Sequence, residues 1–387
     1  MRHKPLDFYD IDDLLTDEDR QIRDAVRAWV DGRVLPIIED HFQAGTFPAH
    51  LVREMGEMGF FGTQLEGYGC PGLSYTAYGL ICQELERGDS GIRSFASVQS
   101  SLVMYPIHRF GSPAQRERWL PGLASGALIG CFGLTEPDHG SDPGAMITRA
   151  EHRGDHYLLR GAKMWITNGS VADVAVVWAK LDGVVRGFLV ERGTEGFSAP
   201  ELKNKHSLRA SVTSELVFDE VRVPLENILP GVEGLKGPLA CLTSARYGIS
   251  WGALGAAGAC FDASREYSLT RHQFGRPLGS FQLVQAKLAG MLREITKGQL
   301  LSWRLGRLMD EGRARHEQVS LAKLNNVDIA LDIARVSRDL HGAAGIVSDF
   351  PVMRHMANLE SVITYEGTHD IHTLVLGRWI TGIQAFS

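Results

Sequence analysis

The strongest constraint on the fold is a change of residue pattern that occurs twice along the chain. Up to about residue 130, apolar residues recur at helical spacing, as at Ile22, Val26 and Val30, and Thr16 followed by three acidic residues predicts a helix start. A second helix is expected from Ser94 onward. After about residue 237 the helical spacing returns. Two stripes there predict long bundle helices: Val284, Leu288, Met291, Leu292, Ile295; and Leu324, Val327, Leu331, Ala334.

Between these two parts the pattern is that of strands. Short β-branched and apolar runs occupy 174–177, 184–190 and 212–218, and turn signals such as Asn168-Gly169 separate them. We therefore predict an α+β fold with three domains. These are an N-terminal all-α domain (1–130), a middle β-barrel or β-sandwich domain (131–236) and a C-terminal four-helix bundle (237–387).

Bulk properties agree with this division and exclude several protein classes. The 387 residues exceed the roughly 250–300 at which a single core stops growing. The net charge of −6, without a long block of like charge, argues against a nucleic-acid partner. Five scattered cysteines fit neither a disulfide framework nor a zinc site. No apolar run is long enough to span a membrane and no signal or transit peptide is visible, so a cytoplasmic bacterial protein is expected.

Glu366 is the first candidate for a catalytic residue. It follows the apolar and aromatic residues Ile363 and Tyr365, and Gly367 after it permits a turn. Thr368 is placed to cap the next helix. A carboxylate held in such a partly buried turn is suited to act as a general base, because desolvation raises its pKa. The alternative is a carboxylate that serves only to stabilise the start of a helix.

Two other motifs carry little weight. The string Gly67-Tyr68-Gly69-Cys70-Pro71-Gly72 matches a dinucleotide fingerprint, but no βαβ pattern surrounds it, so a glycine-rich loop is the better interpretation. His369 and His372 could share a helix face, but nothing supplies a third ligand, and no metal site is predicted.

Several longer strings carry a family resemblance that covers essentially the whole chain. Residues 365–386 read YEGTHDIHTLVLGRWITGIQAF, and residues 131–142 read CFGLTEPDHGSD. Both resemble signatures of the acyl-CoA dehydrogenase family. The resemblance implies the α–β–α architecture, an FAD cofactor, a homotetramer, and transfer of electrons to electron-transfer flavoprotein. It also implies that Glu366 abstracts the proton alpha to the thioester carbonyl.

The same resemblance assigns the remaining site residues, although a plain turn, a core tryptophan and a solvated arginine are the ordinary alternatives. The FAD residues it implies are Phe132, Leu134, Thr135, Gly140, Ser141, Trp165, Ile166, Thr167, Arg271, Phe274, Gln282, Asp339, His341, Gly342 and Thr368. Arg271 would reach the flavin of a neighbouring subunit. The acyl-CoA residues it implies are Ser141, Leu239, Leu242, Arg246, Tyr365, Gly367 and Phe386.

The segment from Glu84 to Met104 bears on the substrate. Its Glu86, Arg93 and Ser94 resemble the branch of the family that acts on glutaryl-CoA, in which the arginine grips the distal carboxylate. A plain fatty acyl chain needs no cation at the end of its pocket, whereas a buried carboxylate must be paired. The expected reaction is FAD-dependent oxidation and decarboxylation of glutaryl-CoA to crotonyl-CoA and CO2. A non-decarboxylating enzyme, a short-chain acyl-CoA dehydrogenase and a catalytically silent CoA-ester-binding protein remain alternatives.

Overall fold

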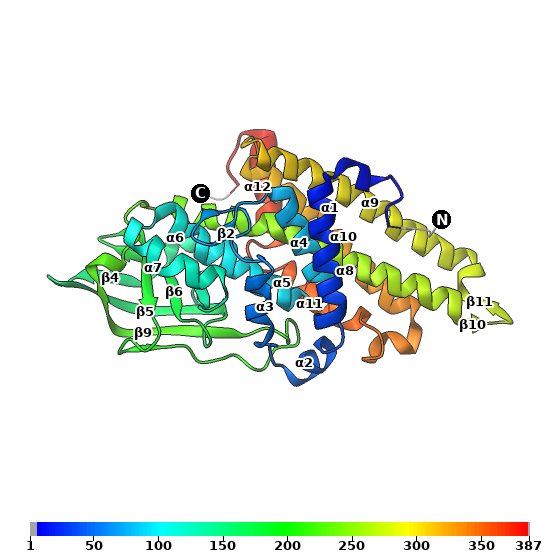
Figure 1. The fold of residues 1–387 in the computed structure, drawn as a ribbon, viewed down its shortest axis with the longest axis horizontal. Coiled ribbons are helices and arrows are strands. Elements are labelled where there is room, and N and C mark those ends of the chain that lie inside the picture. Colours follow the sequence, from blue (N-terminus) through cyan, green and yellow to red (C-terminus); the bar gives the residue numbers. More distant parts are fainter. Residues whose placement is uncertain (1–5, 386–387) are drawn as a thin grey trace.

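The structure is a computed structural model that describes residues 6–385. Figure 1 shows an elongated molecule in which a β-sheet forms one end and long helices form the middle and the other end. The N-terminal and C-terminal helices lie side by side in the middle, so parts of the chain that are far apart in sequence meet there.

The helices before the sheet follow ordinary start signals. Thr16 caps the first helix in a capping box, in which its side chain accepts from the Asp19 amide and the Asp19 carboxylate accepts from the Thr16 amide. These helices are α1 (Asp17–Trp29), α2 (Ile38–Ala44), α3 (Leu51–Glu57), α4 (Tyr75–Gly88), α5 (Ser90–Ser97), α6 (Tyr105–Phe110) and α7 (Pro113–Ala124).

The helix expected from Ser94 starts four residues earlier than predicted. Asp89 is its N-cap and accepts a hydrogen bond from the Gly91 amide, so α5 begins at Ser90. A π-helical segment, Val98–Met104, then joins α5 to α6. The wrong start has a simple cause, because both Asp89 and Ser94 are good capping residues and the sequence does not rank them.

The glycine-rich string at 67–72 is a hairpin. Strands β1 (Glu66–Gly67) and β2 (Cys70–Pro71) pair in antiparallel fashion, and Tyr68 and Gly69 at the turn both have positive φ. A hairpin turn with two such residues matches the twist of the flanking strands. The prediction of a glycine-rich loop without a dinucleotide-binding βαβ unit is confirmed.

The middle of the chain forms one seven-stranded sheet. The strands are β3 (Gly130–Gly133), β4 (Arg149–His152), β5 (His156–Thr167), β6 (Val174–Leu181), β7 (Val184–Glu191), β8 (Phe197–Ser198) and β9 (Thr213–Pro224). The order is β3-β6-β4-β5-β9-β8, with β7 on β6. Strands β3 and β4 run parallel to β6, and the other pairs are antiparallel. The three predicted runs are strands β6, β7 and β9.

The C-terminal part contains the predicted bundle. Its helices are α8 (Lys236–Thr270), α9 (Gln282–Asp310), α10 (His316–Leu340), α11 (Val352–Val362) and α12 (His369–Thr381), and a hairpin of β10 (His272–Gln273) and β11 (Arg276–Pro277) joins α8 to α9. The two predicted stripes lie on α9 and α10, where Met291, Ile295, Val327, Leu331 and Ala334 are buried. The last helix, α12, is closed by Gly382, a C-cap residue with positive φ.

Helix α8 packs closely against α4 because glycines line the contact. A Cβ on Gly255 would lie 1.9 Å from the carbonyl oxygen of Gln83, and a Cβ on Gly252 would lie 2.0 Å from Oε2 of Glu86. Gly79 on α4 makes room in the same way for the Trp251 ring. The approach of these two helices therefore depends on the absence of side chains at those positions.

Replacing Gly252 by alanine should destabilise the protein by about 1–3 kcal/mol, because the added methyl group overpacks a contact that includes a buried carboxylate. Gly290→Ala on α9 is the matched control, since a Cβ there meets nothing within 4 Å. Alanine at that position should be neutral or mildly stabilising. Thermal and denaturant unfolding of the two variants checks this. Equal stability of G252A and wild type would contradict the close packing.

Candidate active site

The backbone around Glu366 has an uncommon conformation. Helix α11 ends at Val362, and the link to α12 contains Glu366 with φ of 53° and Gly367 with φ of 96°. A non-glycine residue in the left-handed region costs about 1 kcal/mol or more unless its surroundings hold it there. Thr368 then caps α12, as predicted, by accepting from the Ile371 amide at 3.2 Å.

Burial and nearby positive charge act in opposite directions on the side chain of Glu366. Its Oε2 is buried and has no hydrogen-bond partner among the described residues. Burial raises the pKa of this carboxyl, while the charges of Arg93, Arg246 and Lys323 act against the rise. A carboxylate with a buried oxygen that accepts no hydrogen bond and with a raised pKa can take a proton from a bound molecule, which is what a general base requires.

Arg93 forms the polar end of the same region. Its side chain is 0% exposed, and its Nε donates to Oε2 of Glu86 at 2.6 Å. Its Nη2 donates to the Tyr365 hydroxyl, and the guanidinium carbon lies 5.6 Å from the centre of the Tyr365 ring. The Ser94 and Tyr365 hydroxyls are 3.3 Å apart. The structure thus brings Glu86, Arg93, Ser94 and Tyr365 together next to Glu366.

One nitrogen of this guanidinium remains available. Arg93 Nη1 is buried and has no hydrogen-bond partner among residues 6–385. A buried donor without a partner costs about 1–3 kcal/mol, and a buried arginine commonly satisfies its second N–H group with a carboxylate. Since Glu86 already occupies Nε, the arrangement can accept a second carboxylate on the same cation.

The residues of α8 surround the base from another side. Arg246 Nε donates to the carbonyl oxygen of Glu366 at 2.6 Å, and burial lowers the pKa of this arginine. Leu242 packs partly buried against the core, and Leu239 is exposed. Gly367 lies close to Arg246 and to His372 on α12, because a Cβ on it would be 3.0 Å from Nη2 of Arg246 and 2.9 Å from Nε2 of His372. Phe386 lies outside the described residues.

The loop after β3 is fixed to β5 by a buried ion pair. Lys163 Nζ lies 2.8 Å from Oε1 of Glu136 and also donates to the Leu134 carbonyl at 3.1 Å. The amides of Ile147 and Thr148 donate to the same carboxylate. Burial works against ionisation of Glu136, but these donors outweigh it and lower its pKa to about 2. Burial lowers the pKa of Lys163 to about 8.

The predicted loop residues on either side of this pair differ in exposure. Phe132 and Leu134 are buried, and the Thr135 carbonyl accepts from the Met164 amide at 2.9 Å, directly before Trp165. Ile166 is buried and Thr167 is half-buried, whereas Gly140 and Ser141 are exposed. Trp165 has φ of 66° and is 65% exposed. An aromatic ring presented to the outside by a constrained backbone offers a flat apolar surface to a planar partner.

The other predicted cofactor residues lie elsewhere. Arg271, Phe274 and Gln282 surround the β10–β11 hairpin, which Figure 1 places at the opposite end of the molecule from strands β4 and β5. Phe274 is 93% exposed. Asp339 pairs with Lys287 at 2.6 Å, and exposed Gly342 follows His341. The buried His341 ring stacks on Tyr267 at 4.5 Å. The hairpin residues therefore lie at the other end of the molecule from the labelled strands β4 and β5.

Two kinds of residue in the site were missed by the sequence analysis. Lys323 on α10 donates to the carbonyls on both sides of Glu366, and the Glu136–Lys163 pair holds the loop. A signal existed for Lys323, because it lies inside the apolar stripe between Val319 and Val327, where a lysine is out of place. No comparable signal marks Lys163.

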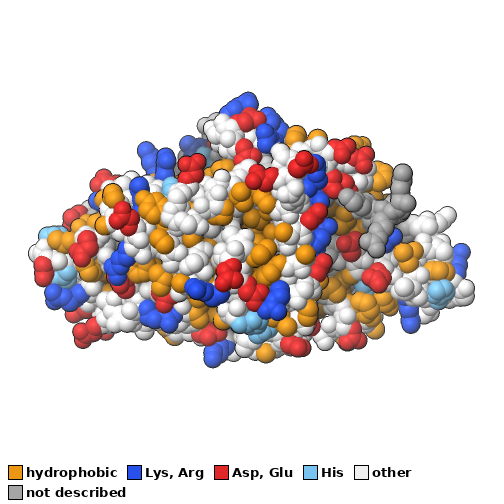
Figure 2. All heavy atoms as spheres, viewed as in Figure 1, with side chains coloured by type: hydrophobic (Ala, Val, Ile, Leu, Met, Phe, Trp, Pro, Cys, Tyr) orange, Lys and Arg blue, Asp and Glu red, His pale blue; other side chains and the backbone are white. Residues whose placement is uncertain are grey.

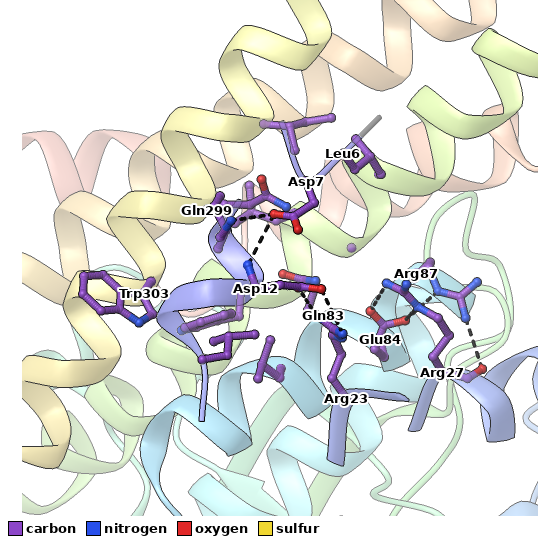
Figure 3. A pocket seen from close by; sticks show the side chains of 18 of the residues that line it. Leu6, Asp7, Asp12, Arg23, Arg27, Gln83, Glu84, Arg87, Gln299 and Trp303 are labelled. Atoms are coloured by element: carbon purple, nitrogen blue, oxygen red, sulfur yellow. Dashed lines mark hydrogen bonds and ion pairs between the residues drawn. The ribbon is translucent and has the colours of Figure 1, made fainter. Parts of the chain in front are cut away.

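Other features of the molecule lie away from this region. A hollow of about 340 Å3 between α1, α4, α8 and α9 is lined by apolar residues and by charged side chains, several of which form ion pairs, such as Arg27 with Glu84 at 2.7 Å (Figure 3). On the face shown in Figure 2, acidic and basic side chains are interspersed. Within residues 6–385 no group of three or more His, Cys, Asp or Glu side chains could hold a metal ion. No described helix is both long and apolar enough to cross a membrane.

Comparison with known proteins gives consistent matches along the chain. Residues 16–127, 131–221 and 233–381 match the family models of the N-terminal, middle and C-terminal domains of acyl-CoA dehydrogenases. A crystal structure of glutaryl-CoA dehydrogenase from Mycobacterium smegmatis is similar, with 56% identity, full coverage of both chains and a TM-score of 0.98. A second structure from that organism, in complex with FADH2, shows 52% identity, full coverage of both chains and a TM-score of 0.98.

A relative with a different substrate is also similar. The mitochondrial short-chain specific acyl-CoA dehydrogenase of Rattus norvegicus is 35% identical over 370 residues, which are 94% of this chain and 90% of the relative. The overall match alone therefore does not select the acyl group, and the choice depends on particular side chains of the site.

Replacing Lys163 by methionine should lower the free energy of unfolding by about 3–5 kcal/mol near neutral pH, because it leaves a buried carboxylate without its cation. Glu136 has a pKa lowered from 4.5 to about 2, so its stabilising effect is present above pH 4.5 and is lost as the pH falls toward 2. The difference between wild type and K163M should shrink over that range. Denaturant unfolding at several pH values measures it, with the exposed Lys297→Met as control.

Proposed function

Because the chain belongs to the acyl-CoA dehydrogenase family, we propose that it oxidises glutaryl-CoA with FAD as cofactor and releases the distal carboxylate as CO2, giving crotonyl-CoA. The observation that carries the choice of substrate is the buried Arg93, which donates to Glu86 and to the Tyr365 hydroxyl and keeps an unpartnered Nη1 among the described residues. A butyryl chain would leave that donor unsatisfied.

The residues around β5 fit an FAD. Trp165 offers an exposed ring for a planar partner, and the exposed backbone at Gly140 and Ser141 carries no bulky side chain. Phe132, Leu134, Thr135, Ile166, Thr167 and Thr368 complete the set that would hold the cofactor. When bound, FAD supplies the acceptor for the hydride that leaves the beta carbon, a task that no side chain can perform.

The chain itself performs the proton transfer. Glu366 takes the alpha proton, and its raised pKa brings its proton affinity closer to that of the carbon acid than an exposed glutamate could. Negative charge then develops on the thioester oxygen and needs hydrogen-bond donors, each of which contributes roughly 10²–10³ in rate. The backbone N–H of Glu366 is the donor that this chain would supply. Arg93 meanwhile orients the acyl chain by holding its far end.

Decarboxylation follows from the position of the second carboxylate. After oxidation, the bond between the gamma carbon and the carboxylate breaks, and its electron pair is delocalised into the thioester. The proton that Glu366 holds is then available for the gamma carbon, which gives crotonyl-CoA. Tyr365 lies next to the base, and its hydroxyl accepts from Arg93, so it contacts the place from which CO2 would leave. We include Tyr365 in the substrate site for this reason.

The partners we propose follow from the same features. The residues assigned to FAD at the β10–β11 hairpin lie at the opposite end of the molecule from strands β4 and β5, which supports a homotetramer in which a neighbouring copy supplies Arg271, Phe274 and Gln282. Exposed apolar side chains such as Leu283 and Ile380 also favour assembly. We propose that electron-transfer flavoprotein receives the electrons and that the protein is cytoplasmic.

The product tests the proposal. Purified protein supplied with glutaryl-CoA and an artificial dye acceptor should bleach the dye and release one CO2 and one crotonyl-CoA for each two electrons. Glu366→Gln should retain bound FAD but reduce it at least about 10³-fold more slowly, because the base is lost. Detection of glutaconyl-CoA without CO2 would instead identify a non-decarboxylating enzyme, and near-normal reduction by E366Q would exclude Glu366 as the base.

Replacing Arg93 should separate glutaryl-CoA from butyryl-CoA. In Arg93→Met the distal carboxylate loses its cation, so kcat/KM for glutaryl-CoA should fall by about 10²–10⁴-fold, as expected for a buried charge pair worth roughly 3–5 kcal/mol. Because the same change leaves Glu86 unpaired, Arg93→Met/Glu86→Gln is the second variant to compare. Equal losses for the two substrates in both variants would favour a short-chain acyl-CoA dehydrogenase with Arg93 as a structural residue.

A further inference from the structure

Three consecutive carbonyl groups around the base all accept hydrogen bonds from cationic side chains. Lys323 Nζ donates to the Tyr365 carbonyl at 3.1 Å and to the Gly367 carbonyl at 2.7 Å. Arg246 Nε donates to the Glu366 carbonyl between them at 2.6 Å. The lysine comes from α10 and the arginine from α8, so side chains of two bundle helices donate hydrogen bonds to the same short segment.

Lys323 is buried without a carboxylate partner among the described residues, which is unusual for a lysine. The residue is 1% exposed, and among the described residues no carboxylate lies within ion-pair distance of its Nζ. Lys163, the other deeply buried lysine, has a direct carboxylate partner in Glu136. A buried ammonium group is costly, and here its hydrogen bonds go to backbone oxygens instead. The free-energy cost of burying this ammonium group therefore goes with the hydrogen bonds that hold the backbone of residues 365–367 in place.

That conformation determines where the catalytic carboxylate points. Glu366 has φ of 53°, a region that a glutamate avoids when it is not held there. The Tyr365 carbonyl, held by Lys323, lies in the peptide plane before Glu366, and the Glu366 carbonyl, held by Arg246, lies in the plane after it. The two cations together fix both planes, and Lys323 at Gly367 fixes the next one, so the direction of the Glu366 Cα–Cβ bond is set. The same peptide planes set the direction of the Glu366 N–H group. A shift of about 1 Å at such a position can lower a rate about 10²-fold.

The groups that face Lys323 come from four elements and are mostly cationic or neutral. They are Glu366 on the linking segment, Arg246 on α8, Arg93 on α5 and His372 on α12. Glu366 is the one anion in this set, although Glu86 neutralises Arg93 from the far side. Burial, Lys323 and Arg246 together lower the pKa of His372 to about 3, so the histidine stays neutral. The positive charge of Lys323 thus acts mainly on Glu366.

We propose that Lys323 is a positioning residue for proton abstraction, which holds the Tyr365–Gly367 backbone so that the Glu366 carboxylate faces the substrate and which lowers the proton affinity of that carboxylate through its charge. The inference rests on the proposed function, since it concerns the same base. Two separable effects follow. The hydrogen bonds set the rate at which a bound substrate loses its proton, and the charge sets the pH below which that rate falls.

Two substitutions separate these effects. Lys323→Met removes both the donors and the charge, and Lys323→Gln removes the charge but keeps an amide with two N–H donors. Lys297→Met, on the exposed side of α9, is the control for the loss of a lysine that touches neither the site nor the core. The measurement is the rate of flavin reduction by saturating glutaryl-CoA in the FAD-loaded protein between pH 5.5 and 9, followed by rapid mixing.

The expected result is a loss of rate without a matching loss of binding. K323M should reduce flavin about 10²-fold more slowly at saturating substrate, with a half-saturating concentration within about threefold of wild type. K323Q should recover at least about tenfold of that loss. Since both variants lack the charge that opposes the rise of the Glu366 pKa, the acid limb of the pH profile should move to higher pH in both. K297M should match wild type in every respect.

Several outcomes would overturn the inference. A wild-type rate and an unmoved acid limb in K323M would do so, and so would a loss that appears only as weaker substrate binding. If K323M does not fold, K323Q decides the matter, because an unmoved acid limb in that variant removes the electrostatic role. Failure of the wild-type protein to be reduced by glutaryl-CoA would count against the proposed function, whereas a reducible wild type with an unaffected K323M counts against Lys323 alone.

Discussion

The close approach of helices α4 and α8 is the constraint on which the site depends. Glycines at 248, 252 and 255 bring the two helices near enough that Glu86 and Arg93 pair within the contact, with a Gly252 Cβ position only 2.0 Å from the carboxylate. Such packing excludes water from the pair and strengthens its attraction. It also directs the rest of the guanidinium toward Tyr365. The packing of α8 against α4 therefore also determines where the Glu86–Arg93 pair lies.

The Tyr365–Gly367 segment joins this polar end to the base. The Tyr365 side chain contacts Arg93 and Ser94, its carbonyl accepts from Lys323, and the next residue is Glu366. Helices α4, α5, α8 and α10 thus all contribute to the position of a single carboxylate. The uncommon backbone conformation of Glu366 is stable because several independent contacts hold the segment in it.

The sequence predicts features of this site that depend on neighbouring residues better than contacts between residues far apart in the chain. Local signals worked well: Thr368 is a cap, Glu366 lies in a constrained turn, and the stripes on α9 and α10 are buried in part, with Val284, Leu288, Leu292 and Leu324 half-buried. Strand β5 is not among the three predicted runs, since its burial does not alternate and its pairing with β9 shifts register between Leu159 and Gly161 and again between Lys163 and Ile166.

Contacts between distant residues could not be derived from spacing. Arg93 and Tyr365 are 272 residues apart, and Lys323 and Gly367 are 44 apart, so neither pairing has a local signature. Family resemblance placed Arg93 near the substrate, but it did not point to Lys323. The two register shifts in β5 likewise depend on the partner strand, which no local pattern specifies.

The charges around the base favour a particular kind of substrate. With Lys323 protonated, the cations Arg93, Arg246 and Lys323 face the carboxylates Glu86 and Glu366, which leaves one positive charge in excess. Burial lowers the pKa of Lys323 to about 7, so this excess is only partly expressed near neutral pH. A dicarboxylyl thioester supplies the missing negative charge through its distal carboxylate, and its arrival favours the protonated lysine. A simple acyl chain adds no charge and would leave the cations to repel one another, so the same electrostatics that place the base also select against uncharged acyl groups.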